Sequence, residues 1–186
     1  MLKRWYVYVT LLCFMLMVPH FTEGASKQYV NPESSILFAD SAQTPAATWT
    51  LSALASGAGR ISARYDRGTG AHSAFYKWRC WAALTGTNVV GATVEYYIAT
   101  GDGTHVDGEI GTADASLATD KRRNLTLLGI LSVDQTTTNV AMTTSGLVYI
   151  PDRYVSLGVW NATTLPFKTD TAISGCNLIP MPMEQQ

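Results

Sequence analysis

The chain has 186 residues, of which 47% are hydrophobic and 15% are charged, and its formal net charge is −1. A chain of this length can bury one sizeable core, and this composition excludes an intrinsically disordered protein. The near-zero charge provides no basic footprint, so no nucleic-acid partner is expected.

The first 25 residues read as a signal-like or anchor-like leader. A basic start precedes a largely apolar run over residues 5–18, which is typical of a secretory signal. The run is shorter than the roughly 20 residues of a membrane span. Three interpretations stay open: a cleaved leader, an anchor retained through residues 5–18, or translation that starts at Met15 or Met17. The first predicts a secreted protein and the second a membrane-anchored one.

Residues 26–47 mix proline, serine and threonine with the apolar residues Val30, Ile36, Leu37 and Phe38. This pattern predicts an extended arm or linker whose apolar residues dock on the domain or on a neighbouring subunit. The folded domain is then expected to occupy residues 48–186.

Short alternating segments follow from residue 48 onward. In residues 48–53 the apolar positions alternate with threonine and serine, which predicts a strand. In residues 60–65 one set of alternate positions is apolar or aromatic and is expected to face inward: Ile61, Ala63 and Tyr65. The other set is expected to face outward: Arg60, Ser62 and Arg64.

Residues 74–100 contain the strongest pattern and are interpreted as two strands in a hairpin-like arrangement. The first strand is expected to bury Tyr76, Trp78, Cys80 and Ala82, and the second Val94, Tyr96 and Ile98. Alternation with aromatic and β-branched residues is typical of half-buried antiparallel strands.

Residues 101–123 form a long irregular segment rich in glycine, aspartate and threonine, with a short helical turn expected at residues 113–120. Such a loop inside a compact domain is usually functional or mobile. Asp102, Asp107 and Glu109 could supply carboxylate ligands to calcium. Their spacing matches no established calcium motif, and Asp-Gly pairs are also ordinary turn residues. Calcium is the one cofactor considered; none is otherwise predicted.

The rest of the chain supplies further strands. Residues 125–133 are almost continuously apolar, which predicts a strand covered on both faces. Residues 139–143 and 146–150 are interpreted as a hairpin, and residues 154–160 and 172–179 as later strands. Eight or nine short strands without convincing helices predict an all-β, two-sheet antiparallel β-sandwich of the jelly-roll type.

The three cysteines, Cys13, Cys80 and Cys176, do not make a disulfide framework. Cys80 and Cys176 could pair, but sequence alone does not give their distance. Because the count is odd, the favoured interpretation is that both are small buried residues with free thiols.

Two sets of side chains could form binding surfaces. Four basic residues on alternate positions of neighbouring segments would form a stripe, and a subunit interface, if their strands are adjacent: Arg60, Arg64, Lys77 and Arg79. The competing interpretation is a solvated face with cross-strand partners such as Glu95. Trp81 and Tyr97 point opposite to the apolar faces of their strands, so they could join an interface or a platform that stacks sugars.

The sequence contains few signs of a catalytic site. No zinc-protease, nucleophile-elbow, P-loop or Cys-x-x-Cys motif occurs, and the three histidines are scattered. The chain is therefore predicted not to be an enzyme. Two glycosylation sequons begin at Asn124 and Asn161 and are relevant only in a eukaryotic secretory pathway.

Three segments resemble a family of small structural proteins of tailed phages: residues 48–70 (TWTLSALASGAGRISARYDRGTG), 94–115 (VEYYIATGDGTHVDGEIGTADA) and 152–163 (DRYVSLGVWNAT). The resemblance covers about residues 48–179. It implies a non-enzymatic, head-associated or capsid-decorating protein that forms homo-oligomers and binds the major capsid protein or another virion protein. It transfers no catalytic residue, and the apolar run at residues 5–18 departs from the family's pattern. The alternative is a secreted carbohydrate-binding or adhesion module with the same fold.

Overall fold

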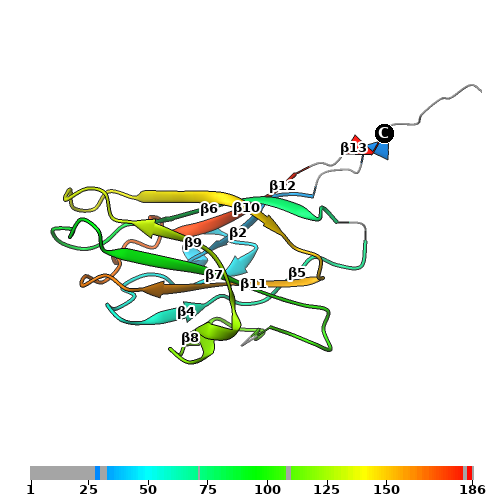
Figure 1. The fold of residues 1–186 in the computed structure, drawn as a ribbon, viewed down its shortest axis with the longest axis horizontal. Helices are drawn as coiled ribbons and strands as arrows, with labels where there is room; N and C mark the ends of the chain where they lie inside the picture. The colour runs from blue at the N-terminus through cyan, green and yellow to red at the C-terminus, as the bar shows by residue number, and fades with distance from the viewer. Residues whose placement is uncertain (1–27, 30–32, 71, 108–109, 182–183, 186) are drawn as a thin grey trace, which may run out of the picture. The chain divides into compact units, whose positions relative to one another are not determined.

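The computed structural model describes residues 28–29, 33–70, 72–107, 110–181 and 184–185, and these are built almost entirely from strands (Figure 1). Two sheets stack face to face, which confirms the predicted β-sandwich. The leader at residues 1–25 lies outside the described residues. Two short strands, β1 (Gln28–Tyr29) and β13 (Glu184–Gln185), pair in a small sheet of their own.

The first sheet has five strands, in the spatial order β10 (Met142–Tyr149), β6 (Phe75–Ala82), β12 (Gly175–Pro180), β2 (Ile36–Ala39) and β3 (Ala47–Thr48). All its pairs are antiparallel except β2 with β3. The sandwich therefore includes β2, although residues 26–47 were expected to form an arm outside the domain. Ile36 and Phe38 dock on the domain as predicted, but as core residues of one of its own strands.

The second sheet has six strands. Five follow the order β8 (Ala115–Leu117), β4 (Gly59–Ile61), β11 (Tyr154–Asn161), β7 (Thr93–Gly101) and β9 (Thr126–Ser132), and β5 (Tyr65–Asp66) also pairs with β11. All the pairs in this sheet are antiparallel. Two 3-10 turns complete the domain: η1 (Ser41–Gln43) and η2 (Lys121–Asn124).

The strand pairing is that of a jelly roll. In chain order the eight principal strands are β2, β4, β6, β7, β9, β10, β11 and β12. The first pairs with the eighth, the second with the seventh, the third with the sixth and the fourth with the fifth. This is the pattern of one long hairpin rolled into two sheets. The described sheets also contain β3, β5 and β8, which are too short to be recognised from alternation.

The main core lies between the two sheets. It includes the inward side chains of β6 and β7, the two strands with the strongest alternation in the sequence. The four inward side chains predicted for β6 and the three predicted for β7 are all buried. The two strands nevertheless belong to different sheets, so the hairpin-like arrangement is wrong. Two strands with one apolar face each can bury those faces against one another across a sandwich instead of pairing edge to edge.

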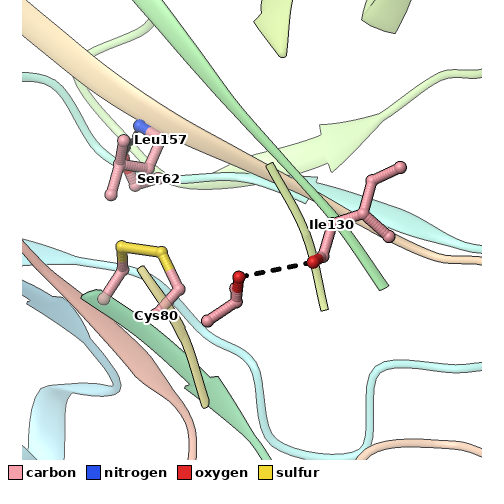
Figure 2. Close-up of a disulfide and its surroundings, with 6 residues drawn as sticks. Ser62, Cys80, Ile130 and Leu157 are labelled. Carbon is pink, nitrogen blue, oxygen red and sulfur yellow. Dashed lines mark hydrogen bonds between the residues drawn. A yellow bond between two sulfur atoms is a disulfide. The ribbon is translucent and has the colours of Figure 1, made fainter. Parts of the chain in front are cut away.

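Trp78 closes the core where β9 and β10 approach each other. A Cβ atom at Gly129 of β9 or at Gly146 of β10 would lie within 3 Å of its indole ring. Thr144 of β10 also donates a hydrogen bond to the Ile130 carbonyl of β9 (Figure 2). Gly146 therefore serves close packing inside one continuous strand, and the hairpin predicted at residues 139–150 is wrong.

Cys80 and Cys176 form a disulfide between β6 and β12 (Figure 2). The two residues are directly opposite in the register of these antiparallel strands, and both are fully buried. The favoured interpretation of two free thiols is thus wrong. Its premise, the odd number of cysteines, counted Cys13, which lies outside the described residues.

Residues 110–125 include the edge strand β8 and place two leucine side chains on the outer face of the six-stranded sheet. Leu117 and Leu125 from this segment bury Ile61 and Ala99 of the sheet in a second, smaller apolar cluster. The expected helical turn at residues 113–120 is instead β8 followed by η2. Ile61 is buried as predicted, but against this segment and not against the opposite sheet.

Three further predictions about strands are corrected. The predicted strand at residues 48–53 continues only to Thr48, although Trp49 and Leu51 are buried. Ser62 was expected to face outward but is fully buried, and its hydroxyl accepts the N–H of Leu157 (Figure 2). Strand β9 was expected to be covered on both faces but lies at the edge of its sheet, with Leu127 half exposed.

Candidate functional site

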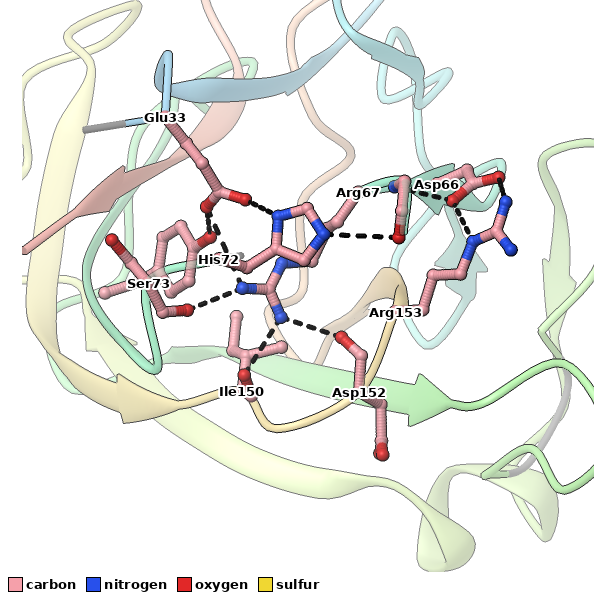
Figure 3. Close-up of polar contacts among 10 residues, drawn as sticks. Glu33, Asp66, Arg67, His72, Ser73, Ile150, Asp152 and Arg153 are labelled. Atoms are coloured by element: carbon pink, nitrogen blue, oxygen red, sulfur yellow. Dashed lines mark hydrogen bonds and ion pairs between the residues drawn. The ribbon is translucent and has the colours of Figure 1, made fainter. Parts of the chain in front are cut away.

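Arg67 is the centre of the largest polar network that the structure describes (Figure 3). Its buried guanidinium donates to the carbonyls of Ile150, Asp152 and Ser73 at 3.0, 2.7 and 2.5 Å. The guanidinium group also lies over the Tyr76 ring, and its Cζ atom is 5.1 Å from the ring centroid. Arg67 thereby ties the loop after β5 to the β10–β11 connection.

Glu33 completes this network from the N-terminal side. Its carboxylate contacts the imidazole of His72 and the hydroxyl of Tyr76, and lies 3.8 Å from the Arg67 guanidinium. Burial and the hydrogen bond to Glu33 raise the pKa of Tyr76. The other imidazole nitrogen of His72 faces the carbonyl of Gly68 at 3.2 Å. These contacts fasten the chain before β2 to the sandwich.

A second cluster surrounds Tyr154 at the start of β11. The guanidinium of Arg64 lies 4.2 Å from the ring centroid and that of Arg153 lies 5.0 Å from it. Arg153 also makes a two-point ion pair with Asp66, which lowers the pKa of Asp66 to about 2. Arg64, a predicted interface residue, is therefore occupied within the molecule.

The predicted basic stripe does not form. Arg60 lies in β4 of the six-stranded sheet, whereas Lys77 and Arg79 lie in β6 of the other sheet. Arg60 makes a two-point ion pair with Asp114. Burial alone would raise the pKa of Asp114, but the hydrogen bonds from Arg60 and from the N–H of Thr50 lower it.

Two of the three predicted calcium ligands are engaged in turns. Asp102 accepts the N–H groups of Thr104 and His105, which lower its pKa. Asp107 accepts the N–H and hydroxyl of Thr100. Glu109 lies outside the described residues. Among the described residues, no three His, Cys, Asp or Glu side chains are arranged to hold a metal ion.

Tyr97, another predicted interface residue, lies on the outer face of the six-stranded sheet. Its hydroxyl donates to Glu95, which also pairs with Arg122 at 2.8 Å. Burial and the contact with Glu95 raise the pKa of Tyr97 to about 12. Arg122 in turn lies over the Trp160 ring, 4.5 Å from its centroid. The aromatic rings of this face are therefore partly covered by the molecule's own charged side chains.

The outer face of the five-stranded sheet is arranged differently, and it is the candidate binding surface. Its outward residues form a grid across three adjacent strands, which we call the docking face: Phe75, Lys77, Arg79 and Trp81 of β6, Thr143, Ser145, Leu147 and Tyr149 of β10, and Gly175, Asn177 and Ile179 of β12. The register sets the neighbours. Lys77 lies between Leu147 and Ile179, and Arg79 lies between Ser145 and Asn177.

Large apolar side chains of the docking face stand in solvent. Leu147 is 67% exposed and Tyr149 is 57% exposed, and Phe75 and Ile179 are exposed beside them. The rings of Phe75 and Tyr149 are in contact, with centroids 5.2 Å apart. An exposed cluster of apolar residues on a folded monomer marks an interaction surface.

Trp81 lies at the other end of the docking face. Its ring covers Gly175 of β12 so closely that a Cβ atom there would lie 2.8 Å from Cζ2. Trp81 is only half-buried, so the ring forms a flat apolar end to the grid. Sequence analysis thus identified Lys77, Arg79 and Trp81, but it missed Leu147, Tyr149 and Ile179. Residues 142–149 show no alternation of apolar and polar residues, so no local signal marked Leu147 and Tyr149 as outward.

The two sequons differ in accessibility. Asn161 is fully buried, and its amide donates to three carbonyls, those of Leu54, Ala55 and Leu165. Its Oδ1 accepts the Thr163 hydroxyl. Asn124 is exposed at the end of η2. The folded chain can therefore offer Asn124 to a modifying enzyme but not Asn161.

No protein-family model matches the chain, and no curated protein sequence matches it significantly. In the part of the chain that the structure describes, no helix is long and apolar enough to span a membrane.

Proposed function

We propose that this chain is a non-enzymatic virion protein that binds another protein of a phage particle through the docking face. The observation that carries the proposal is the exposed apolar cluster around Phe75, Leu147 and Tyr149. Such a cluster is costly in water and is retained where a partner covers it. The partner expected from the sequence resemblance is the major capsid protein or another virion component.

The arrangement of ionisable groups supports a binding role over a catalytic one. Arg67 is occupied by backbone carbonyls, and Asp66 and Asp114 are occupied by arginines. These pairs join neighbouring segments of the chain. Catalytic groups instead converge on a place that a substrate can enter.

The jelly-roll topology is compatible with the proposal. This fold is used by viral capsid proteins and by lectins, so fold alone does not decide between particle assembly and glycan binding. Glycan binding would use free aromatic faces. The rings of Trp160 and Tyr154 are stacked against Arg122, Arg64 and Arg153, so among the exposed aromatic residues that the structure describes only those of the docking face could serve a glycan.

A secreted adhesion module is the second candidate, and the disulfide favours it. Bonds such as Cys80–Cys176 form in oxidising compartments and are rare in the cytosol. A basic start followed by an apolar run at residues 5–18 is in keeping with export. In this case the docking face would bind a protein on a cell surface.

The test is to purify particles of the virus whose genome encodes the chain and to identify their proteins by mass spectrometry. We expect the chain to copurify with particles at a constant ratio to the major capsid protein. Its absence from particles, together with its presence in the culture medium without residues 1–25, would overturn the virion proposal and favour the secreted module.

A further inference from the structure

We propose that the docking face binds a protein surface that presents carboxylates surrounded by apolar side chains. The inference rests on the proposed function, and it adds the chemistry of the partner. Two features of the face carry it: its cations have no partner among the described residues, and its outward positions include no acid.

Lys77 and Arg79 stand two residues apart in the middle strand of the docking face, and both are exposed. Neither has an ion-pair partner in the described part of the chain. Most other arginines of the domain are paired or stacked, as Arg60 is with Asp114 and Arg122 with Glu95; the exposed Arg123 is not, among the described residues. These two cations are thus the positive charges of the face that remain available to a partner.

Apolar side chains flank Lys77, whereas Arg79 lies between Ser145 and Asn177. Leu147 and Ile179 flank Lys77 in the register of the sheet, and Phe75 and Trp81 lie at the two ends of β6. A partner that covers these apolar side chains removes water from around Lys77 and Arg79. Their charges must then be neutralised, because an unpaired charge is expensive to bury. The occupant therefore needs carboxylates at the centre of its contact and apolar groups at the margin.

A second copy of the chain does not meet this requirement. If two docking faces met across a twofold axis that passes between Lys77 and Arg79, these cations of each copy would face the same cations of the other. The eleven outward residues of the face include no aspartate or glutamate to neutralise them. Like charges brought together in this way oppose association.

The experiment measures how full-length protein rebinds to purified particles that lack it, with the protein labelled fluorescently and added over a range of concentrations. One double variant, Lys77→Glu with Arg79→Glu, reverses the positive charge of the docking face. A second, Leu147→Ser with Tyr149→Ser, removes exposed apolar area. The matched controls are Arg123→Glu, an exposed cation in η2, and Leu127→Ser, an exposed leucine in β9. Circular dichroism and thermal melts confirm that each variant folds.

We expect each docking-face variant to weaken particle binding by about tenfold or more, and the two controls to bind like the wild type. Unchanged binding by both docking-face variants would overturn the inference while leaving the virion function standing. Failure of the wild type itself to bind would remove the proposed function and the inference together.

Charge reversal also separates the acidic partner from a second copy. With an acidic partner, Lys77→Glu lowers binding. With a second copy it supplies a carboxylate for Arg79 of the other subunit, so association becomes stronger. Light scattering that shows a Lys77→Glu dimer tighter than any wild-type dimer would overturn the acidic-partner inference.

Discussion

The outer faces of the two sheets differ in how they are covered. The outer face of the six-stranded sheet is partly covered by Leu117 and Leu125, which form a second apolar cluster with Ile61 and Ala99, and ion pairs lie around it. The docking face carries exposed apolar residues and two cations without partners among the described residues. One face is partly covered by the chain itself, and the other is exposed, as the proposed docking role requires.

The two sheets are also stabilised differently. The five-stranded sheet has a disulfide between two adjacent strands, whereas the six-stranded sheet has its second apolar cluster. A covalent link can hold an uncovered sheet in one register without adding material to its outer face. The disulfide thus allows the docking face to remain both ordered and exposed.

The largest expected effect is that of removing this link. Replacing both Cys80 and Cys176 by alanine should lower the free energy of unfolding by about 4 kcal/mol, because the cross-link closes a loop of 96 residues in the unfolded chain. Urea denaturation followed by tryptophan fluorescence measures the change. Reducing agent should shift the wild-type midpoint and leave the double variant unchanged. A loss below about 1 kcal/mol would mean that the disulfide is not what holds the five-stranded sheet.

The next largest effect tests the cover over the other sheet. Leu117→Ala should cost about 2–3 kcal/mol, because Leu117 is almost fully buried in the second cluster and its truncation leaves a cavity. The same denaturation experiment measures it. If the cost were near zero, Leu117 would not be packed on the outer face of the sheet, and the contrast between the two faces would fail.

Low pH should weaken the ion pairs that lie on the six-stranded sheet. The Arg153 pair lowers the pKa of Asp66 from 3.8 to about 2, and the Arg60 pair lowers that of Asp114. A carboxylate with a depressed pKa stabilises the fold above its unfolded pKa, and this contribution is lost as the pH falls through the folded pKa.

Wild-type melting temperature should therefore fall between about pH 4 and pH 2, and Asp66→Asn should make the fall shallower. The difference should be small, since Asp66 is exposed. Thermal melts in buffers of constant ionic strength measure it. Parallel pH profiles for the two proteins would show that this pair contributes nothing.

Alternation along the sequence predicted burial well but did not predict sheet membership. In β6 every second side chain is buried, as expected. The same rule placed Ile61 inside and Ser62 outside, yet both are buried, because the six-stranded sheet is covered on its outer face as well. A strand's own residues do not reveal which later segment will cover it.

The candidate surface was predictable only in part, for a related reason. Lys77 and Arg79 were recognised because they interrupt an apolar strand. Leu147 was not, because Ser145 and Gly146 beside it have the composition of a turn. The glycine is needed for the Trp78 ring, a contact between residues 68 positions apart. Local patterns carry no information about such a contact, and it decides that residues 142–149 are one strand.

The smallest expected effect on stability belongs to the docking face itself. Leu147→Ser should change the free energy of unfolding by less than about 0.5 kcal/mol, because a side chain that is 67% exposed loses little packing when it is truncated. The same substitution should improve solubility at high protein concentration, since it removes exposed apolar surface. Denaturation and turbidity measurements on one preparation test both statements. A large loss of stability would show that Leu147 packs within its own domain, and the exposed face would then be part of the fold instead of a place for a partner. Retained stability with unchanged turbidity would mean that Leu147 is too isolated to act as a contact, and the binding surface would have to centre on Phe75 and Tyr149.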